Sequence, residues 1–196
     1  MNISVGSSIV PCSAIVRDLD VLLDSELFVK QHISNVTSTC YYHLRRLHQI
    51  HNYISCETMI QLVMSLVISH IDYCNSVLVG FLASTLAPLQ RVQNAATWII
   101  LGLSRRSHIT HSLKQLLWLP IKFYIIFKVA STMHSIFHQR SPPYLKESST
   151  KVISSQVNDC TSNKNSVRSF ALLVCRPDIW NNLPVNIRLT DSPAAF

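Results

Sequence analysis

The chain has 196 residues, enough for one domain or slightly more, and 48% of them are apolar, enough for a core. Its net charge is +7, unevenly spread: residues 1–100 have five basic and six acidic residues, a balance of −1, and residues 101–196 have twelve and four, a balance of +8. Three glycines exclude a Gly-rich phosphate loop, and no run of about 20 apolar residues predicts a membrane-spanning helix.

The N-terminal part is predicted to form one or two short strands within residues 8–24, where Ile, Val and Leu alternate loosely with polar residues. No basic region precedes an apolar stretch at the N-terminus, so a signal peptide and a membrane partner are not expected. The six cysteines include no C-x-x-C pair and are expected to be reduced. We therefore expect an intracellular chain, in the nucleus or the cytoplasm.

Three helices follow in the prediction. The first has five apolar residues three and four positions apart on one face: Ile33, Val36, Cys40, Leu44 and Leu47. The second begins after Ser55, a typical N-cap, and is apolar on nearly all sides up to about Tyr73, which predicts a central and buried helix. The third runs from about Thr85 to Leu101, with Pro88 in its first turn and Gly102 as its stop.

Two further helices are predicted before the pattern ends at Pro142 and Pro143. Thr110 is expected to cap a short fourth helix. The fifth runs from Pro120 to about Gln139, and its inward residues are expected to be Phe123, Phe127, Ala130 and Phe137. The periodicity thus predicts a mainly α fold, a four- to five-helix bundle with short β segments at the N- and C-terminal ends.

Four segments occur in a fixed order: Ile71-Asp72-Tyr73-Cys74-Asn75-Ser76, then Leu89-Gln90-Arg91-Val92-Gln93-Asn94-Ala95-Ala96, then Trp118-Leu119-Pro120, and finally Ile179-Trp180-Asn181-Asn182-Leu183-Pro184. In these segments the chain resembles the C-terminal part of a reverse transcriptase from a LINE-type (non-LTR) retrotransposon. It departs from that pattern at Asp20, where the family usually has Gly, and at Leu117, where it usually has His. Such departures favour a decayed copy over ordinary divergence.

The resemblance implies that the bundle is thumb-like and divides the chain into four parts. These are a palm-edge strand remnant (1–30), a helical thumb and connector domain (31–146), a flexible linker (147–166) and a truncated C-terminal β/turn segment (167–196). The polymerase chemistry of the family lies upstream of this region.

Catalytic chemistry is not expected. Polymerases hold two metal ions with clustered carboxylates, which reverse transcriptases supply as an aromatic-x-Asp-Asp hairpin, whereas no two of the seven Asp here are adjacent. Cys40 and His43 formally allow a nucleophile pair, but a buried structural Cys is favoured. The histidine pairs at 108 and 111 and at 134 and 138 have helical spacing, but uncoordinated histidines are favoured because zinc needs more ligands. We expect no catalytic, cofactor-binding or metal-binding residue.

Binding to nucleic acid is better supported. From Tyr73 to Lys146 the chain has eight basic residues and no acidic one, and phosphates are natural partners for such a stretch. By resemblance the region grips the RNA or DNA backbone without sequence preference. Tyr41, Tyr42, Trp98 and Trp118 are stacking candidates, although the core is favoured for both tryptophans. The candidate backbone contacts are Arg45, Arg46, Arg91, Arg105, Arg106, Lys114, Lys122 and Lys128.

The sequence thus predicts a non-catalytic C-terminal fragment of an RNA-directed DNA polymerase with residual backbone binding. One alternative is a small helical protein-interaction module, whose exposed apolar surface meets a missing palm domain or another copy of the chain. The other is a relic that is translated rarely or never and has no function of its own.

Overall fold

The computed structural model describes residues 2–5, 8–11, 15–24, 29–104 and 106–143. The predicted linker and C-terminal segment, 147–196, and the fourth motif lie outside this part of the chain. The described part is mainly helical, as predicted. Its elements are β1 (Asn2–Val5), β2 (Ser8–Pro11), β3 (Ile15–Asp18), β4 (Val21–Asp24), α1 (Lys30–Ile50), η1 (His51–Tyr53), α2 (Cys56–Val63), η2 (Met64–Ile68), α3 (Ser69–Asp72), η3 (Asn75–Leu78), α4 (Ala83–Ile100), α5 (Ile109–Gln115) and α6 (Ile121–Phe137).

The strands form two antiparallel hairpins, β1–β2 and β3–β4; three of the strands lie within residues 8–24, where one or two were expected. Asp18 pairs with Val21 across a two-residue turn, in which Leu19 and Asp20 both have positive φ, 44° and 67°. Two-residue hairpin turns of this kind favour Gly because it has no Cβ. The turn therefore gives a physical reason for the Gly that the resembling family has at position 20.

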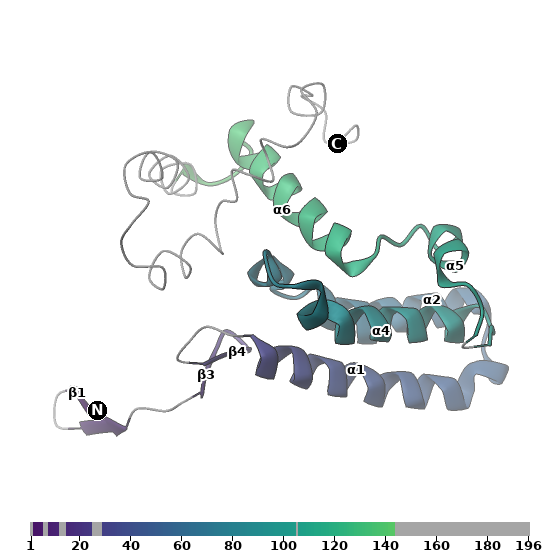
Figure 1. Ribbon diagram of the computed structural model, residues 1–196, viewed down its shortest axis with the longest axis horizontal. Coiled ribbons are helices and arrows are strands. Elements are labelled where there is room, and N and C mark those ends of the chain that lie inside the picture. Colours follow the sequence, from purple (N-terminus) through teal and green to yellow (C-terminus); the bar gives the residue numbers. More distant parts are fainter. Residues whose placement is uncertain (1, 6–7, 12–14, 25–28, 105, 144–196) are drawn as a thin grey trace.

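The helices form a bundle in which α1 and α4 run side by side and in the same direction (Figure 1). The chain returns between them through α2, η2 and α3, which contact α1, while α2 also contacts α4. Helices α5 and α6 then pack on α4, and α6 also contacts η3. At the far end of α1, a Cβ built on Gly102 would lie 3.6 Å from Cε1 of His51, so the carboxyl ends of α1 and α4 meet.

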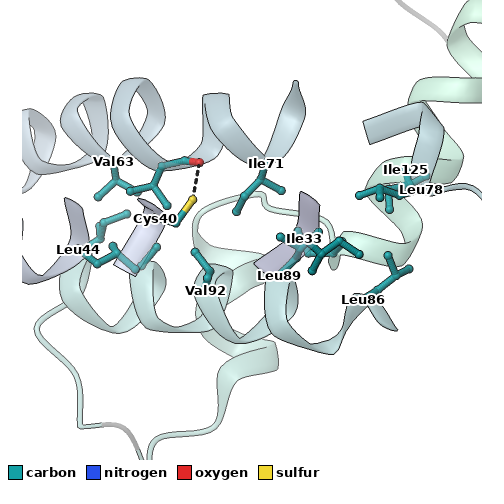
Figure 2. Close-up of a cluster of buried hydrophobic side chains, with 14 of the residues drawn as sticks. Ile33, Cys40, Leu44, Val63, Ile71, Leu78, Leu86, Leu89, Val92 and Ile125 are labelled. Atoms are coloured by element: carbon teal, nitrogen blue, oxygen red, sulfur yellow. Dashed lines mark hydrogen bonds between the residues drawn. The ribbon is translucent and has the colours of Figure 1, made fainter. Parts of the chain in front are cut away.

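The core lies between α1, the α2–α3 segment and α4, and takes Ile121 and Ile125 from the start of α6 (Figure 2). The apolar stripe predicted for the first helix is confirmed: all of it is buried except Val36, which is partly buried against the same core. On α4, Leu86, Leu89, Val92 and Ala96 are buried, and Ile99 is partly buried against the core. Burial of these stripes is the main favourable contribution to folding.

The predicted second helix is one helical stretch made of α2, η2 and α3, and its middle part, η2, is a π-helical turn. Its buried residues recur at every fourth position: Met59, Val63, Val67 and Ile71. In an α-helix of 3.6 residues per turn such a row would wind around the axis. The wider π turn offsets this drift, so the row stays against the core.

Ser69 compensates for the backbone change that the π turn introduces. Its amide donates to the carbonyl of Met64, five residues back, instead of that of Ser65. Its hydroxyl donates to the Ser65 carbonyl. One residue therefore satisfies both carbonyls, which is how serine side chains make irregular helical turns tolerable.

The helix ends were predicted with mixed success. Ser55 caps α2, since its hydroxyl accepts from the Thr58 amide at 3.2 Å. Gly102, at φ 60°, ends α4 as predicted. Its amide donates to the Ile99 carbonyl and the next amide, that of Leu103, donates to Trp98, which is a Schellman motif.

Other expectations about the helices were wrong. α4 begins at Ala83, so Pro88 lies in its second turn. α5 begins after His108 with no side-chain cap, so Thr110 lies inside the helix. The α2–η2–α3 segment is buried along one face only, because Met64 and other residues on its outer side are exposed or partly exposed.

The aromatic face of α6 was also assigned wrongly. Phe123 is 56% exposed, and Phe127 and Phe137 are exposed too. Ala130 is buried as expected. The inward residues in the first half of the helix are Ile121 and Ile125.

A strained helix end yields a stability prediction. Leu117 ends α5 with φ 56° and is 91% exposed. The left-handed conformation costs an L-residue about 1–2 kcal/mol, a penalty that Gly avoids. Part of this gain in stability is offset because Gly has greater conformational freedom in the unfolded chain. We expect Leu117→Gly to raise the free energy of unfolding by about 0.5–1 kcal/mol in urea titrations. Leu117→Ala, which keeps the Cβ, is the control and should give no gain.

Candidate nucleic-acid interface

The first motif segment, residues 71–76, holds several elements together. The Asp72 carboxylate accepts hydrogen bonds from the Tyr124 hydroxyl at 2.7 Å and the Asn75 amide at 3.1 Å, and forms an ion pair with Lys128 at 3.1 Å. Tyr124 and Lys128 lie one turn apart on α6, so this carboxylate joins α6 to the end of α3. The hydrogen bond to Asp72 and, above all, burial raise the pKa of Tyr124, which keeps its hydroxyl a donor.

The next residue of the segment, Tyr73, joins the β3–β4 hairpin to the bundle. Its hydroxyl donates to the carbonyl of Leu19 at 2.7 Å. Ile71 is buried in the core, and Cys74 takes the left-handed conformation that turns the chain into η3. Residues 71–75 thus each have a structural role.

The second and third motif segments meet each other. The Gln93 amide donates to the Leu119 carbonyl at 2.8 Å, and the Gln90 carbonyl oxygen accepts from the Ile121 amide at 2.9 Å. The Gln90 amide donates to Gln93 and Asn94, each at 2.9 Å, which orients the pair. Gln90 therefore satisfies a backbone donor of the first turn of α6, which has no partner within its own helix.

The candidate basic residues fall into three groups. Arg45 and Arg46 lie in the second half of α1, Arg106 follows α4, and Lys114 lies on α5; all four are exposed and make no ion pair within the described part of the chain. The carboxyl ends of α1 and α4 meet, and α5 packs on α4 at the same end, on the side away from α1 (Figure 1), so these cations lie toward one end of the bundle. Arg105 lies outside the described residues.

The other three candidates lie elsewhere. Arg91, exposed on α4, donates to the Ala87 carbonyl of its own helix at 3.4 Å. Lys122 is exposed in the first turn of α6. Lys128 is paired with Asp72, so its charge is already partly neutralised within the fold.

The aromatic candidates differ in exposure, and neither tryptophan is fully buried. Tyr41 and Tyr42 are exposed on α1, whereas Trp118 is partly buried against the core and Trp98 is half-buried in α4. Tyr42 lies edge-on to His43, with ring centroids 5.5 Å apart, and His43 stacks on His70 of α3 at 5.8 Å. A row of flat rings thus crosses from α1 to α3.

Cys40 is fully buried, and its thiol donates to the Val67 carbonyl in the π turn at 3.7 Å (Figure 2). Burial raises the pKa of Cys40 to about 12, so the nucleophilic thiolate is not formed at neutral pH. The structural interpretation of Cys40 is therefore supported over a Cys40–His43 nucleophile pair.

Within the described residues no three His, Cys, Asp or Glu side chains are placed to hold a metal ion. His108, just before α5, and His111, on α5, are both exposed, and His134 is buried beside His138 with ring centroids 4.2 Å apart. None of the helices in the described ranges combines the length and the hydropathy that a membrane span needs.

Sequence reasoning missed a polar cavity of about 570 Å³ between the β3–β4 hairpin, α1 and α3. His32, in the first turn of α1, lines it and is only 7% exposed. The sole signal in the sequence was the polar spacing of Asn35 and Thr39 on α1, which is also the spacing of an ordinary solvent-facing stripe.

Comparison with known proteins gives no match: no family model, curated protein sequence or solved structure matches this chain. Any family assignment therefore depends on the motif segments alone.

The Asp72–Tyr124 contact can be tested by a double-mutant cycle. We expect Asp72→Ala and Tyr124→Phe each to destabilise the fold, and to show a coupling energy of about 1–2 kcal/mol in denaturant titrations. The matched control is Tyr42→Phe, whose hydroxyl has no partner among the described residues and which should be additive with Asp72→Ala within about 0.5 kcal/mol. Additivity at Tyr124 would contradict the contact.

Thiol reactivity tests the burial of Cys40. At pH 8 we expect iodoacetamide to alkylate the exposed Cys56 in the native protein, and Cys40 only after addition of denaturant, because the Cys40 thiol is inaccessible and its pKa is raised. Site-resolved mass spectrometry over time gives both rates. Equal native rates at the two cysteines would contradict the packing of α1 against η2.

Proposed function

We propose that this chain is a non-catalytic, thumb-like helical module, related to the C-terminal part of a LINE-type reverse transcriptase, that binds the backbone of RNA or DNA without sequence preference. The supporting observation is the group of exposed cations at one end of the bundle, Arg45, Arg46, Arg106 and Lys114. Glu57, in the first turn of α2, is the described acidic residue closest in sequence to Arg45 and Arg46.

The physical reason is charge balance. A carboxylate neutralises Lys128, whereas the cations at this end make no ion pair with the described residues. Phosphates would neutralise them and release condensed counterions, which supplies affinity that is independent of sequence. Four exposed cations at one end of the bundle are enough for weak binding, in keeping with a module that aids a polymerase rather than one that selects a site.

The motif segments support the relationship indirectly. They include the residues that hold α6 against the bundle, so a chain with the same residues would have the same helical arrangement. The proposed partners are accordingly RNA or DNA and, for a fragment of a larger enzyme, the palm domain that precedes the thumb.

A second candidate function is favoured by a specific surface. Leu119, Phe123 and Phe127 are exposed at the start of α6, and apolar side chains gathered on one helix are typical of contact surfaces for proteins. In this alternative the chain is a protein-interaction module that binds a palm domain or another copy of itself.

Salt dependence tests backbone binding. With a labelled single-stranded oligonucleotide we expect log affinity to fall linearly with log salt, with a slope of about −3 for four contacts. Arg45→Ala, Arg46→Ala, Arg106→Ala and Lys114→Ala should each weaken binding and reduce the magnitude of the slope by about 1. Lys128→Met is the control: it should lower stability through Asp72 and leave the slope unchanged.

The same material separates the two functions. Affinity that is independent of salt would contradict backbone binding. A dimer in light scattering that dissociates in the Phe123→Ser, Phe127→Ser double variant, without any affinity for the oligonucleotide, would establish the protein-interaction alternative.

A further inference from the structure

The polar cavity between the β3–β4 hairpin and the helices has the dimensions of a ligand site. Its volume, about 570 Å³, lies within the range of small-molecule pockets, roughly 300–1,000 Å³. The Tyr73–Leu19 hydrogen bond ties one wall to the other. This hydrogen bond holds the hairpin wall of the cavity against its helical wall.

His32 gives the cavity an unsatisfied polar group. The residue is more than nine-tenths buried, and its Nδ1 has no hydrogen-bond partner in the described part of the chain. Burial lowers the pKa of His32 and the Asp20 carboxylate opposes this, so the imidazole is neutral at pH 7. A buried polar atom without a partner destabilises a fold. Because Nδ1 itself has almost no accessible surface, a ligand in the cavity would meet the other atoms of the His32 ring.

The walls favour a neutral ligand that forms hydrogen bonds. Arg17 and Asp20 are paired with each other, so the two hairpin residues that line the cavity add no net charge to its wall. Asn35 and Thr39 face the cavity from α1, and their side chains form no hydrogen bond with the described residues. An anion would find no free cation here, whereas a ring with both donors and acceptors would find several partners.

The surroundings of the cavity favour a flat ring attached to a charged chain. His70 lines the cavity and stacks on His43, which contacts Tyr42. Arg46 follows Tyr42 by one turn on the same face of α1. The row of rings therefore leads from the cavity to the cations that are proposed to bind phosphates.

We propose that this cavity takes one unpaired nucleobase of a single-stranded RNA or DNA, while the sugar–phosphate backbone follows α1 toward Arg46. This inference rests on the proposed function and specifies its substrate as single-stranded. Proteins recognise single strands in this way, by stacking splayed bases on aromatic or histidine rings and by hydrogen bonds to base edges.

Two oligonucleotides of equal length and phosphate number provide the test, one with bases and one abasic throughout. In fluorescence anisotropy we expect the strand with bases to bind at least about 5-fold more tightly, the lower end of what one stacked base contributes. Equal affinity for the two strands would overturn the proposal while leaving backbone binding intact.

Two variants locate the effect. Thr39→Met should fill the cavity and abolish the preference for bases, whereas Ser38→Met, exposed on the neighbouring face of α1, should keep it. His32→Leu should remove the same preference and raise the melting temperature, because an apolar side chain replaces an unpaired polar one. Retention of the preference in Thr39→Met and His32→Leu would place the base elsewhere and overturn the proposal.

Free nucleosides separate the cavity from the backbone contacts. In NMR titrations at millimolar concentration, adenosine, guanosine, cytidine and uridine are each tested for shifts of the His32 ring signals. Shifts for at least one nucleoside, absent in Thr39→Met, would support the cavity even if oligonucleotide binding failed, in which case only the backbone function is lost. No shift with any of the four would overturn the cavity's role.

Discussion

The Asp72 carboxylate fixes the orientation of α6, and with it which surfaces the protein shows to solvent. A half-buried carboxylate is stable only when donors surround it, and two of its three donors, Tyr124 and Lys128, come from α6. They lie one turn apart, so α6 must present that face to α3. Ile121 and Ile125 then fall on the adjoining stripe and enter the core.

The same constraint explains the exposed aromatic face of α6. Phe123 and Phe127 precede Tyr124 and Lys128 by one residue each, and successive residues of an α-helix are turned by about 100°. Once the polar pair faces Asp72, the phenylalanines point away from it. Hydrophobicity alone favours burying the larger aromatic residues, and this is why the sequence pattern gave the wrong face: a carboxylate 52 positions earlier in the chain decides the rotation.

Local patterns predicted what local physics controls. The stripe of α1, the Ser55 cap and the Gly102 stop were all predictable, since each depends on residues within a few positions of one another. The π turn could not be predicted in this way. It keeps a row of residues four positions apart against the core, and that core is formed by other helices. The cavity was not predictable either, since it joins residues 17–20, 32–39 and 69–73 through the Tyr73–Leu19 contact.

The motif residues have mainly structural roles, and this changes what the resemblance can support. Asp72, Gln90 and Gln93 satisfy partners inside the fold, whereas the four cations proposed to meet phosphates all lie outside the motif segments. A pattern of this kind constrains the helical arrangement strongly and the binding surface weakly. The case for nucleic acid is therefore electrostatic.

Helix α1 carries both the cavity that is proposed to take a base and two of the cations that are proposed to bind phosphates. One face carries the buried stripe, Ile33, Cys40, Leu44 and Leu47. The opposite face begins with the polar cavity at Asn35 and Thr39 and continues through Tyr42 to Arg46. A nucleotide has a neutral ring and a charged phosphate, which need different environments: the ring gains from an uncharged site that offers stacking and hydrogen bonds, and the phosphate from exposed cations. Along about 31 Å of one helix, α1 offers the two environments in sequence, anchored by the same buried stripe.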